Sequence, residues 1–130
     1  MAKATSLQVR HYSNLTESKL ADDITFVSTG ATETCPLTHS IVRADATAEA
    51  ITTFTIPDGD VGQMLTIIAE GHATNNIEVT PTTSTIFDSI TLDTVGDTCV
   101  IYYMNDTIGW AILSMSSVTV DTCPAYAVAT

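Results

Sequence analysis

The sequence predicts an all-β protein, a small antiparallel β-sandwich or barrel of the jelly-roll-like type with an extended N-terminal arm. Thr, Val and Ile are abundant, and β-branched side chains suit a pleated sheet better than a helix. Short apolar stretches also recur between turn-forming residues, as in sandwiches and barrels. With 130 residues, 45% of them hydrophobic, the chain can bury one modest core. We expect an arm at residues 1–21 and a single β-domain at 22–130.

The arm is predicted because residues 1–20 show no sustained helical period. Apolar side chains alternate weakly with polar ones, and three bases face a single acid, Glu17, so this stretch is net positive. Opposite charge would draw it onto an acidic surface, where its apolar side chains would hold it. Six residues are the candidate contacts of the arm: Lys3, Leu7, Val9, Arg10, Tyr12 and Lys19.

The first half of the β-domain shows a weak strand pattern. We expect short strands at residues 24–27 and 40–43, and a loop at 28–36. Residues 44–50 are rich in Ala and allow either a helical turn or a loop. Phe54 and Ile56 fall on one face of an alternating strand at 51–56, which a Pro-Asp-Gly-Asp turn follows.

The β pattern is stronger in the second half. Residues 63–69 and 98–104 read as strands apolar enough to be buried on both faces. A loop is expected at 70–76, turns at 93–97 and 105–109, and further strands at 77–80, 89–92, 110–115 and 118–120. The expected core includes Leu65, Ile67, Ile101, Trp110 and Ile112.

The charge distribution makes nucleic acid a poor partner. The formal net charge is -11, and no Lys or Arg follows Arg43, so phosphates would be repelled. No apolar run approaches the ~20 residues that cross a bilayer, which argues against a membrane protein. The first five residues lack the apolar region of a signal peptide, so we expect synthesis in the cytoplasm.

Metal and cofactor sites are not predicted. The histidines, His11, His39 and His72, form no metal-binding spacing. The carboxylates of Asp22-Asp23 and Asp58-Gly59-Asp60 could attract Ca²⁺, but neither fits an EF-hand loop and turn formation is the commoner role of Asp.

The three cysteines, Cys35, Cys99 and Cys123, are expected to be buried free thiols in a protein made in a reducing compartment. A bridge between Cys35 and Cys123 is the alternative. There is no nucleophile elbow and no Gly-rich phosphate loop. The single Trp110 reads as a core anchor and not as part of a sugar-binding cleft. An enzyme is therefore the least favoured class, with a secreted carbohydrate-binding module ranked just above it.

A series of short motifs runs from residue 39 to 115, which is 77 of the 130 residues. An apolar strand ends in a Pro turn, and a Gly-led strand follows it. A strand ending in Thr-Pro comes after an Asn-rich loop, and a Tyr-containing strand leads to a Gly-Trp strand. The segments are 54–57, 62–67, 75–81, 90–92, 96–97 and 109–113. This series resembles a small β-domain of tailed-phage virion proteins, found in head-decoration (cement) proteins and in tail-fibre segments.

The resemblance implies a structural virion protein without enzymatic activity. It would decorate the outer capsid surface as a homo-oligomer, most simply a trimer, with the major capsid protein as its partner. The alternative is a trimeric tail-fibre or receptor-binding domain. The short chain, its own arm and the lack of shaft repeats favour decoration over a fibre. No binding residue is transferred from the resemblance.

Overall fold

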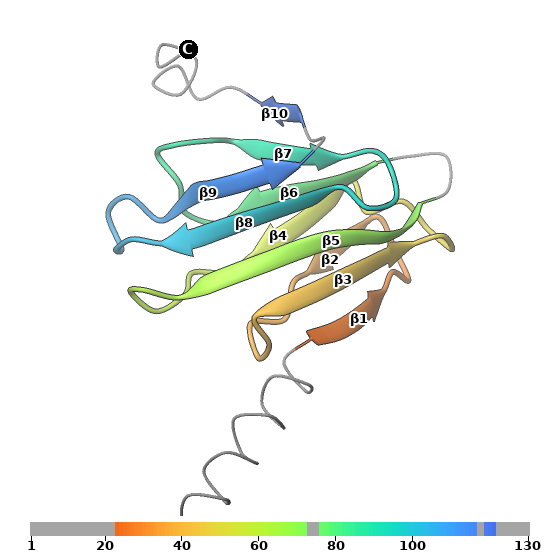
Figure 1. Cartoon of the computed structure of the whole chain (residues 1–130), viewed down its shortest axis with the longest axis horizontal. Helices are drawn as coiled ribbons and strands as arrows, with labels where there is room; N and C mark the ends of the chain where they lie inside the picture. Colours follow the sequence, from red (N-terminus) through yellow and green to blue (C-terminus); the bar gives the residue numbers. More distant parts are fainter. Residues whose placement is uncertain (1–22, 73–75, 117–118, 122–130) are drawn as a thin grey trace, which may run out of the picture.

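The computed structural model describes residues 23–72, 76–116 and 119–121, which form two five-stranded sheets (Figure 1). Sheet A has the order β1-β3-β5-β8-β9 and sheet B the order β10-β7-β6-β4-β2. The strands are β1 Asp23–Val27, β2 Thr32–Thr34, β3 Ile41–Ala46, β4 Thr53–Ile56, β5 Met64–His72, β6 Ile77–Pro81, β7 Ser89–Leu92, β8 Thr98–Tyr103, β9 Trp110–Ser116 and β10 Thr119–Asp121.

The first six strands alternate between the two sheets. β1, β3 and β5 pair in parallel in sheet A, and β2, β4 and β6 pair in parallel in sheet B. Parallel neighbours need a crossover connection, and here each crossover runs through a strand of the opposite sheet. In the first half of the domain the chain therefore passes back and forth between the two sheets, and each passage adds one parallel strand.

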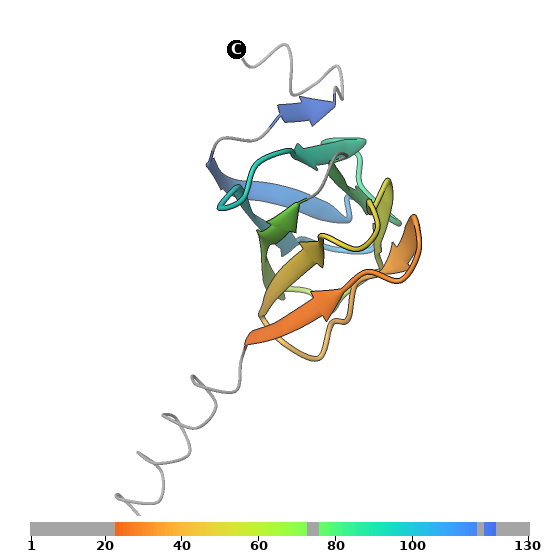
Figure 2. The same cartoon turned by 90° about the vertical axis from the view of Figure 1, so that its right-hand side faces the viewer.

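The second half is antiparallel. β6 pairs with β7, β8 with both β5 and β9, and β7 with β10. Seen from the end of the strands, the two sheets lie side by side as the layers of a sandwich (Figure 2). The all-β sandwich is confirmed, and its sheets are mixed where wholly antiparallel ones were expected.

The core lies between the sheets and follows the two-residue period of the strands. In β3 and β8 every second residue is buried and the residues between are partly exposed. Leu65, Ile67, Ile101 and Trp110 are fully buried, as predicted, while Ile112 is partly buried against the core.

Three element predictions were wrong for one reason. Residues 32–34, expected in a loop, form β2 by pairing with β4. Residues 44–46, expected in a helical turn or loop, continue β3, and residues 70–72 continue β5, because these segments pair with each other. Pairing between distant segments overrides weak local preference.

The strands at 63–69 and 98–104 were expected to be buried on both faces, and this was also wrong. In β5, Leu65 and Ile67 are buried, but Met64 is 51% exposed and Ile68 is only partly buried. Nothing among the described residues covers the outer face of sheet A.

Candidate functional site

The outer face of sheet A carries a patch of apolar side chains on the strands β3, β5, β8 and β9. Met64 lies opposite Tyr102, and Thr66 lies between Ile41 and Val100 in the register. We call this patch the apolar face: Ile41, Met64, Ile68, Val100, Tyr102 and Leu113.

A bulge adds Leu113 to the apolar face. The register of β8 and β9 shifts between Val100 and Ile101, so β9 has one residue more than its partner at this point. In such a bulge two residues stand opposite one. Leu113 is therefore held on the outer side next to Ser114, and its side chain is 54% exposed.

The charge of the body contrasts with this face. Residues 23–121 contain thirteen acids and one base, Arg43, and so carry a formal net charge of −12. None of the six residues of the apolar face is charged, although they lie on the surface of a strongly acidic body. An uncharged apolar patch on a highly charged protein is typical of a contact surface.

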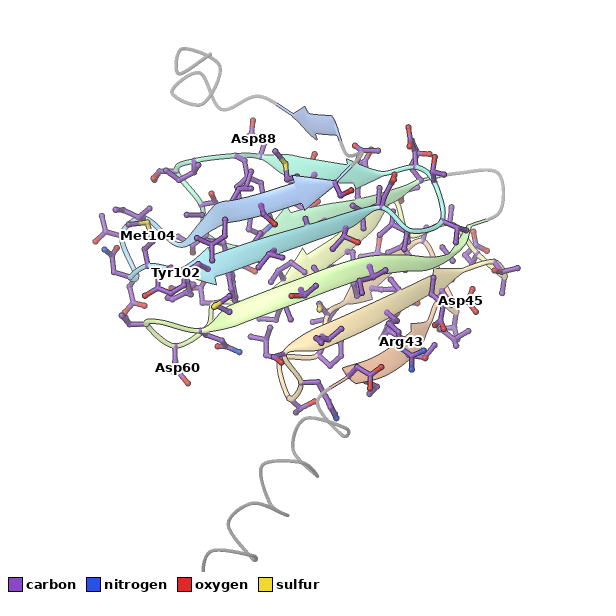
Figure 3. All side chains as sticks on the ribbon, in the orientation of Figure 1. Arg43, Asp45, Asp60, Asp88, Tyr102 and Met104 are labelled. Atoms are coloured by element: carbon purple, nitrogen blue, oxygen red, sulfur yellow. The ribbon has the colours of Figure 1, made fainter. Side chains whose placement is uncertain are left out.

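The single base of the body lies at the margin of the apolar face. Arg43 on β3 donates from Nη1 to Glu70 Oε1 on β5 at 2.9 Å. Its Nε lies 2.8 Å from Asp23 Oδ2 on β1, an ion pair without hydrogen-bond geometry. All three side chains are more than a third exposed, so these pairs contribute little to stability. They do pair the guanidinium of Arg43, which is labelled in Figure 3, with acids of its own molecule.

Acids without a neighbouring base lie at the other end of β5. Asp58 and Asp60 lie in the β4–β5 loop and Asp106 in the β8–β9 turn, all exposed. Tyr103 OH donates to Asp106 Oδ1 at 3.0 Å. Burial, the hydrogen bond to Asp106 and the charges of Asp106 and Asp58 together raise the pKa of Tyr103 to about 12. Figure 3 shows Asp60 and Tyr102 at this end of sheet A.

The outer face of sheet B is different in kind. Its strands present threonines to the outside, with Thr34, Thr55 and Thr80 in one row of the register. Short hydroxylated side chains on a half-exposed sheet need no partner other than water. The two outer faces thus differ, and sheet A carries the apolar one.

The buried thiols do not form a reactive centre. Cys35 and Cys99 are free and buried, and burial raises the pKa of each to about 12. Thiols of this kind remain protonated near neutral pH and react poorly. The alternative bridge involved Cys123, which lies outside the described residues.

The other candidate residues do not converge on a site. The six arm residues predicted as contacts (Lys3, Leu7, Val9, Arg10, Tyr12 and Lys19), and also His11 and Asp22, lie outside the described residues. His39 Nδ1 lies 2.9 Å from the hydroxyl of the adjacent Thr38. Within residues 23–72, 76–116 and 119–121, no three His, Cys, Asp or Glu side chains are grouped so that they could hold a metal ion. The same residues include no helix long and apolar enough to span a membrane.

Sequence reasoning missed the apolar face, although a signal for it was present. β5 and β8 carry apolar residues on both faces, with Met64 and Ile68 outward on β5 and Val100 and Tyr102 outward on β8, which we interpreted as burial on both faces. A strand with apolar residues on both faces is equally compatible with a sandwich whose outer face binds a partner. Sequence alone does not distinguish these cases.

Comparison with known proteins adds no family to this description. No protein-family model matches the chain, and no curated protein matches it significantly.

Proposed function

We propose that this chain is a structural virion protein that decorates a tailed-phage capsid. It would bind the outer capsid surface as a homo-oligomer, most simply a trimer, and stabilise the shell without catalysing a reaction. The observation that carries the proposal is the uncharged apolar face of sheet A on a body with a net charge of −12. Residues 39–115 resemble a β-domain of tailed-phage virion proteins, and this resemblance supports a phage capsid as the assembly that the face would contact.

In this proposal the apolar face, the acidic remainder of the surface and the arm have three different roles. Contact between copies removes the apolar face from water, at about 25 cal/mol per Å² of apolar surface. The acidic remainder faces solvent and keeps the particle soluble. The arm, with its three bases, grips a neighbouring subunit or the capsid. A clamp that binds only the assembled lattice stabilises that lattice by mass action.

A sedimentation experiment tests this function on the intact chain. Purified protein is mixed with undecorated capsids of the phage that encodes it, and the bound fraction is measured after pelleting. The intact protein should pellet with the capsids and raise their melting temperature. The variant Leu7→Ser/Val9→Ser should bind at least about tenfold more weakly, because each buried aliphatic side chain contributes about 1.5–3 kcal/mol.

The matched control changes the intervening polar positions of the same segment, Ser6→Ala/Gln8→Ala. It should bind as the intact protein does, and circular dichroism should show the same β content for all three proteins. If the intact protein fails to pellet with capsids, or binds isolated tail fibres instead, the decoration proposal is wrong. If it pellets but both variants bind equally well, the arm is not the anchor.

A further inference from the structure

We propose that the apolar face of sheet A is the receiving surface for the N-terminal segment of a second copy of this chain. Residues 3–10 of one copy would lie extended along β5 and β8 of its neighbour. This inference deepens the proposed function, and it rests on it in one respect only, namely that copies of the chain assemble with one another.

The first argument is the chemistry of the surface. Met64 and Leu113 are 51% and 54% exposed, and Ile68 and Val100 are partly exposed on the same face, with the small polar residues Thr66 and Ser114 between them. Such a face is stabilised by an occupant that brings aliphatic side chains at every second position. Leu7 and Val9 have that spacing and point to the same side of an extended segment.

The second argument is the position of the charges. Acids flank the apolar face at both ends of β5, with Asp58, Asp60 and Asp106 at one end. Asp45 lies at the other end, next to Glu70, which already pairs with Arg43. The segment carries a base on each side of Leu7 and Val9, namely Lys3 and Arg10. An occupant with bases at its ends and aliphatic side chains between them complements this surface.

The third argument is length. The distance from Met64 to Glu70 along β5 is six residue steps, roughly 20 Å at about 3.3 Å per residue. Lys3 and Arg10 are seven steps apart, roughly 23 Å in an extended chain at the same rise. A base therefore reaches each acidic end. Leu7 and Val9 lie roughly 13 and 20 Å from Lys3, over the half of the strand nearer Arg10. Lys3 is on the same side of the segment as Leu7 and Val9, whereas Arg10 alternates to the other side and would reach its acid around the end of the strand.

Charge and area together favour a second copy as the source of the segment. Two bodies of −12 would repel each other if their faces met directly, because the base of each body, Arg43, is already paired on its own molecule. A segment eight residues long covers about one or two strand widths of a face four strands wide, since strands lie about 4.8 Å apart. A stable interface removes about 800 Å² from each partner, so the adjoining residues of the donor's net-positive arm must contribute to the rest.

Site-specific photo-crosslinking of the full-length purified protein tests this inference without any capsid. A benzophenone amino acid replaces Leu113 in one preparation and Met64 in another, both at exposed positions. The matched control places the same group at Thr34, which is exposed on β2 at the outer face of sheet B. Isotopically heavy and light chains are mixed before irradiation, so that a link between copies is recognised by its mass.

Trypsin makes the result easy to assign, because the four bases divide the chain into five peptides. We expect the Leu113 and Met64 probes to join peptide 44–130 of one copy to peptide 4–10 of another, and the Thr34 probe, which lies in peptide 20–43, to form no link with peptide 4–10. The charge reversals Lys3→Glu/Arg10→Glu remove the two flanking cleavage sites and leave peptide 1–19, which should show no link to peptide 44–130 of another copy. Links between two 44–130 peptides would show that the faces meet directly, and links to 4–10 within one copy would show that each arm covers its own face. Either result, or no link at all, overturns the inference.

Because no capsid is present, this outcome is separate from that of the sedimentation experiment. If the protein pellets with capsids but shows no link between copies, the decoration proposal stands, and the inference that residues 3–10 bind a second copy is wrong. If the protein shows the link but does not pellet with capsids, the inference about residues 3–10 stands and the decoration proposal is wrong.

Discussion

At the residue scale, Trp110 joins three parts of the fold. Its indole is fully buried at the start of β9, and its ring lies edge-on to Tyr103 with centroids 5.2 Å apart. Nε1 donates to the carbonyl of Pro57 at 2.9 Å, which ties β9 to the β4–β5 loop. The large ring fills the space between the two sheets, and its N–H is hydrogen-bonded, so its burial leaves no polar group unpaired. The single tryptophan is thus a structural anchor, as predicted from the sequence.

We expect Trp110→Ala to destabilise the protein by about 3–5 kcal/mol, because the ring leaves a cavity that the two sheets cannot close. The matched variant Trp110→Phe keeps most of the ring and removes the bond to Pro57, so it should cost less, about 1–3 kcal/mol. Urea denaturation followed by circular dichroism measures both. Equal stability of the alanine variant and the intact protein would show that the ring does not support the core.

At the element scale, side-chain acceptors and glycines define the two turns that flank β8. Asp97 is buried, and its Oδ2 accepts from the N–H groups of Asp93 and Thr94 at 2.9 Å each. Gly96 and Gly109 have φ values of 97° and 76°, where a Cβ is unfavourable. The turn residues were recognised from the sequence because this chemistry is local.

The two glycines differ in their surroundings, which makes them a matched pair. A Cβ at Gly96 meets nothing within 4 Å, whereas one at Gly109 overlaps the carbonyl of Thr83. Gly96→Ala should therefore cost only the conformational strain, about 1–2 kcal/mol. Gly109→Ala should cost that strain and a further 1–3 kcal/mol, roughly, for the displaced backbone. Thermal unfolding of both variants checks the order, and a reversed order would contradict this account of the β8–β9 turn.

At the scale of the whole molecule, the sandwich buries groups that must stay protonated for it to remain folded. Burial raises the pKa values of Cys35 and Cys99 from 9.0 to about 12 and that of Tyr103 from 10.0 to about 12. Above pH 9 the unfolded chain releases protons that the native protein keeps. The stability from these groups is complete below pH 9 and is lost as the pH rises toward 12.

We therefore expect the free energy of unfolding to fall between pH 9 and 11, by on the order of 1 kcal/mol per pH unit for each buried thiol. Urea titrations at a series of pH values, with reductant present, measure this slope. The variant Cys35→Ala/Cys99→Ala should be less stable at pH 7 but should lose less stability between pH 9 and 10. A slope that is the same in both proteins would assign the alkaline loss to other groups.

Features that depend on neighbouring residues were predictable from the sequence. The strand periodicity, the turns around Gly96 and Gly109 and the burial of Leu65, Ile67, Ile101 and Trp110 all follow from local pattern and side-chain chemistry. The excess of acid in the body is also a property of the sequence alone.

Which segments pair, and which apolar residues lie outside the core, depends on the tertiary structure. Asp23 pairs with Ile41, and Ile41 with Thr66, so the register of sheet A joins residues 18 and 25 positions apart. No local pattern encodes such a separation, which is why β2 and the ends of β3 and β5 were misassigned. The apolar face arises in the same way. Ile68 and Leu65 have the same hydrophobic character along β5, and only the position of sheet B decides that Leu65 is buried and Ile68 faces outward.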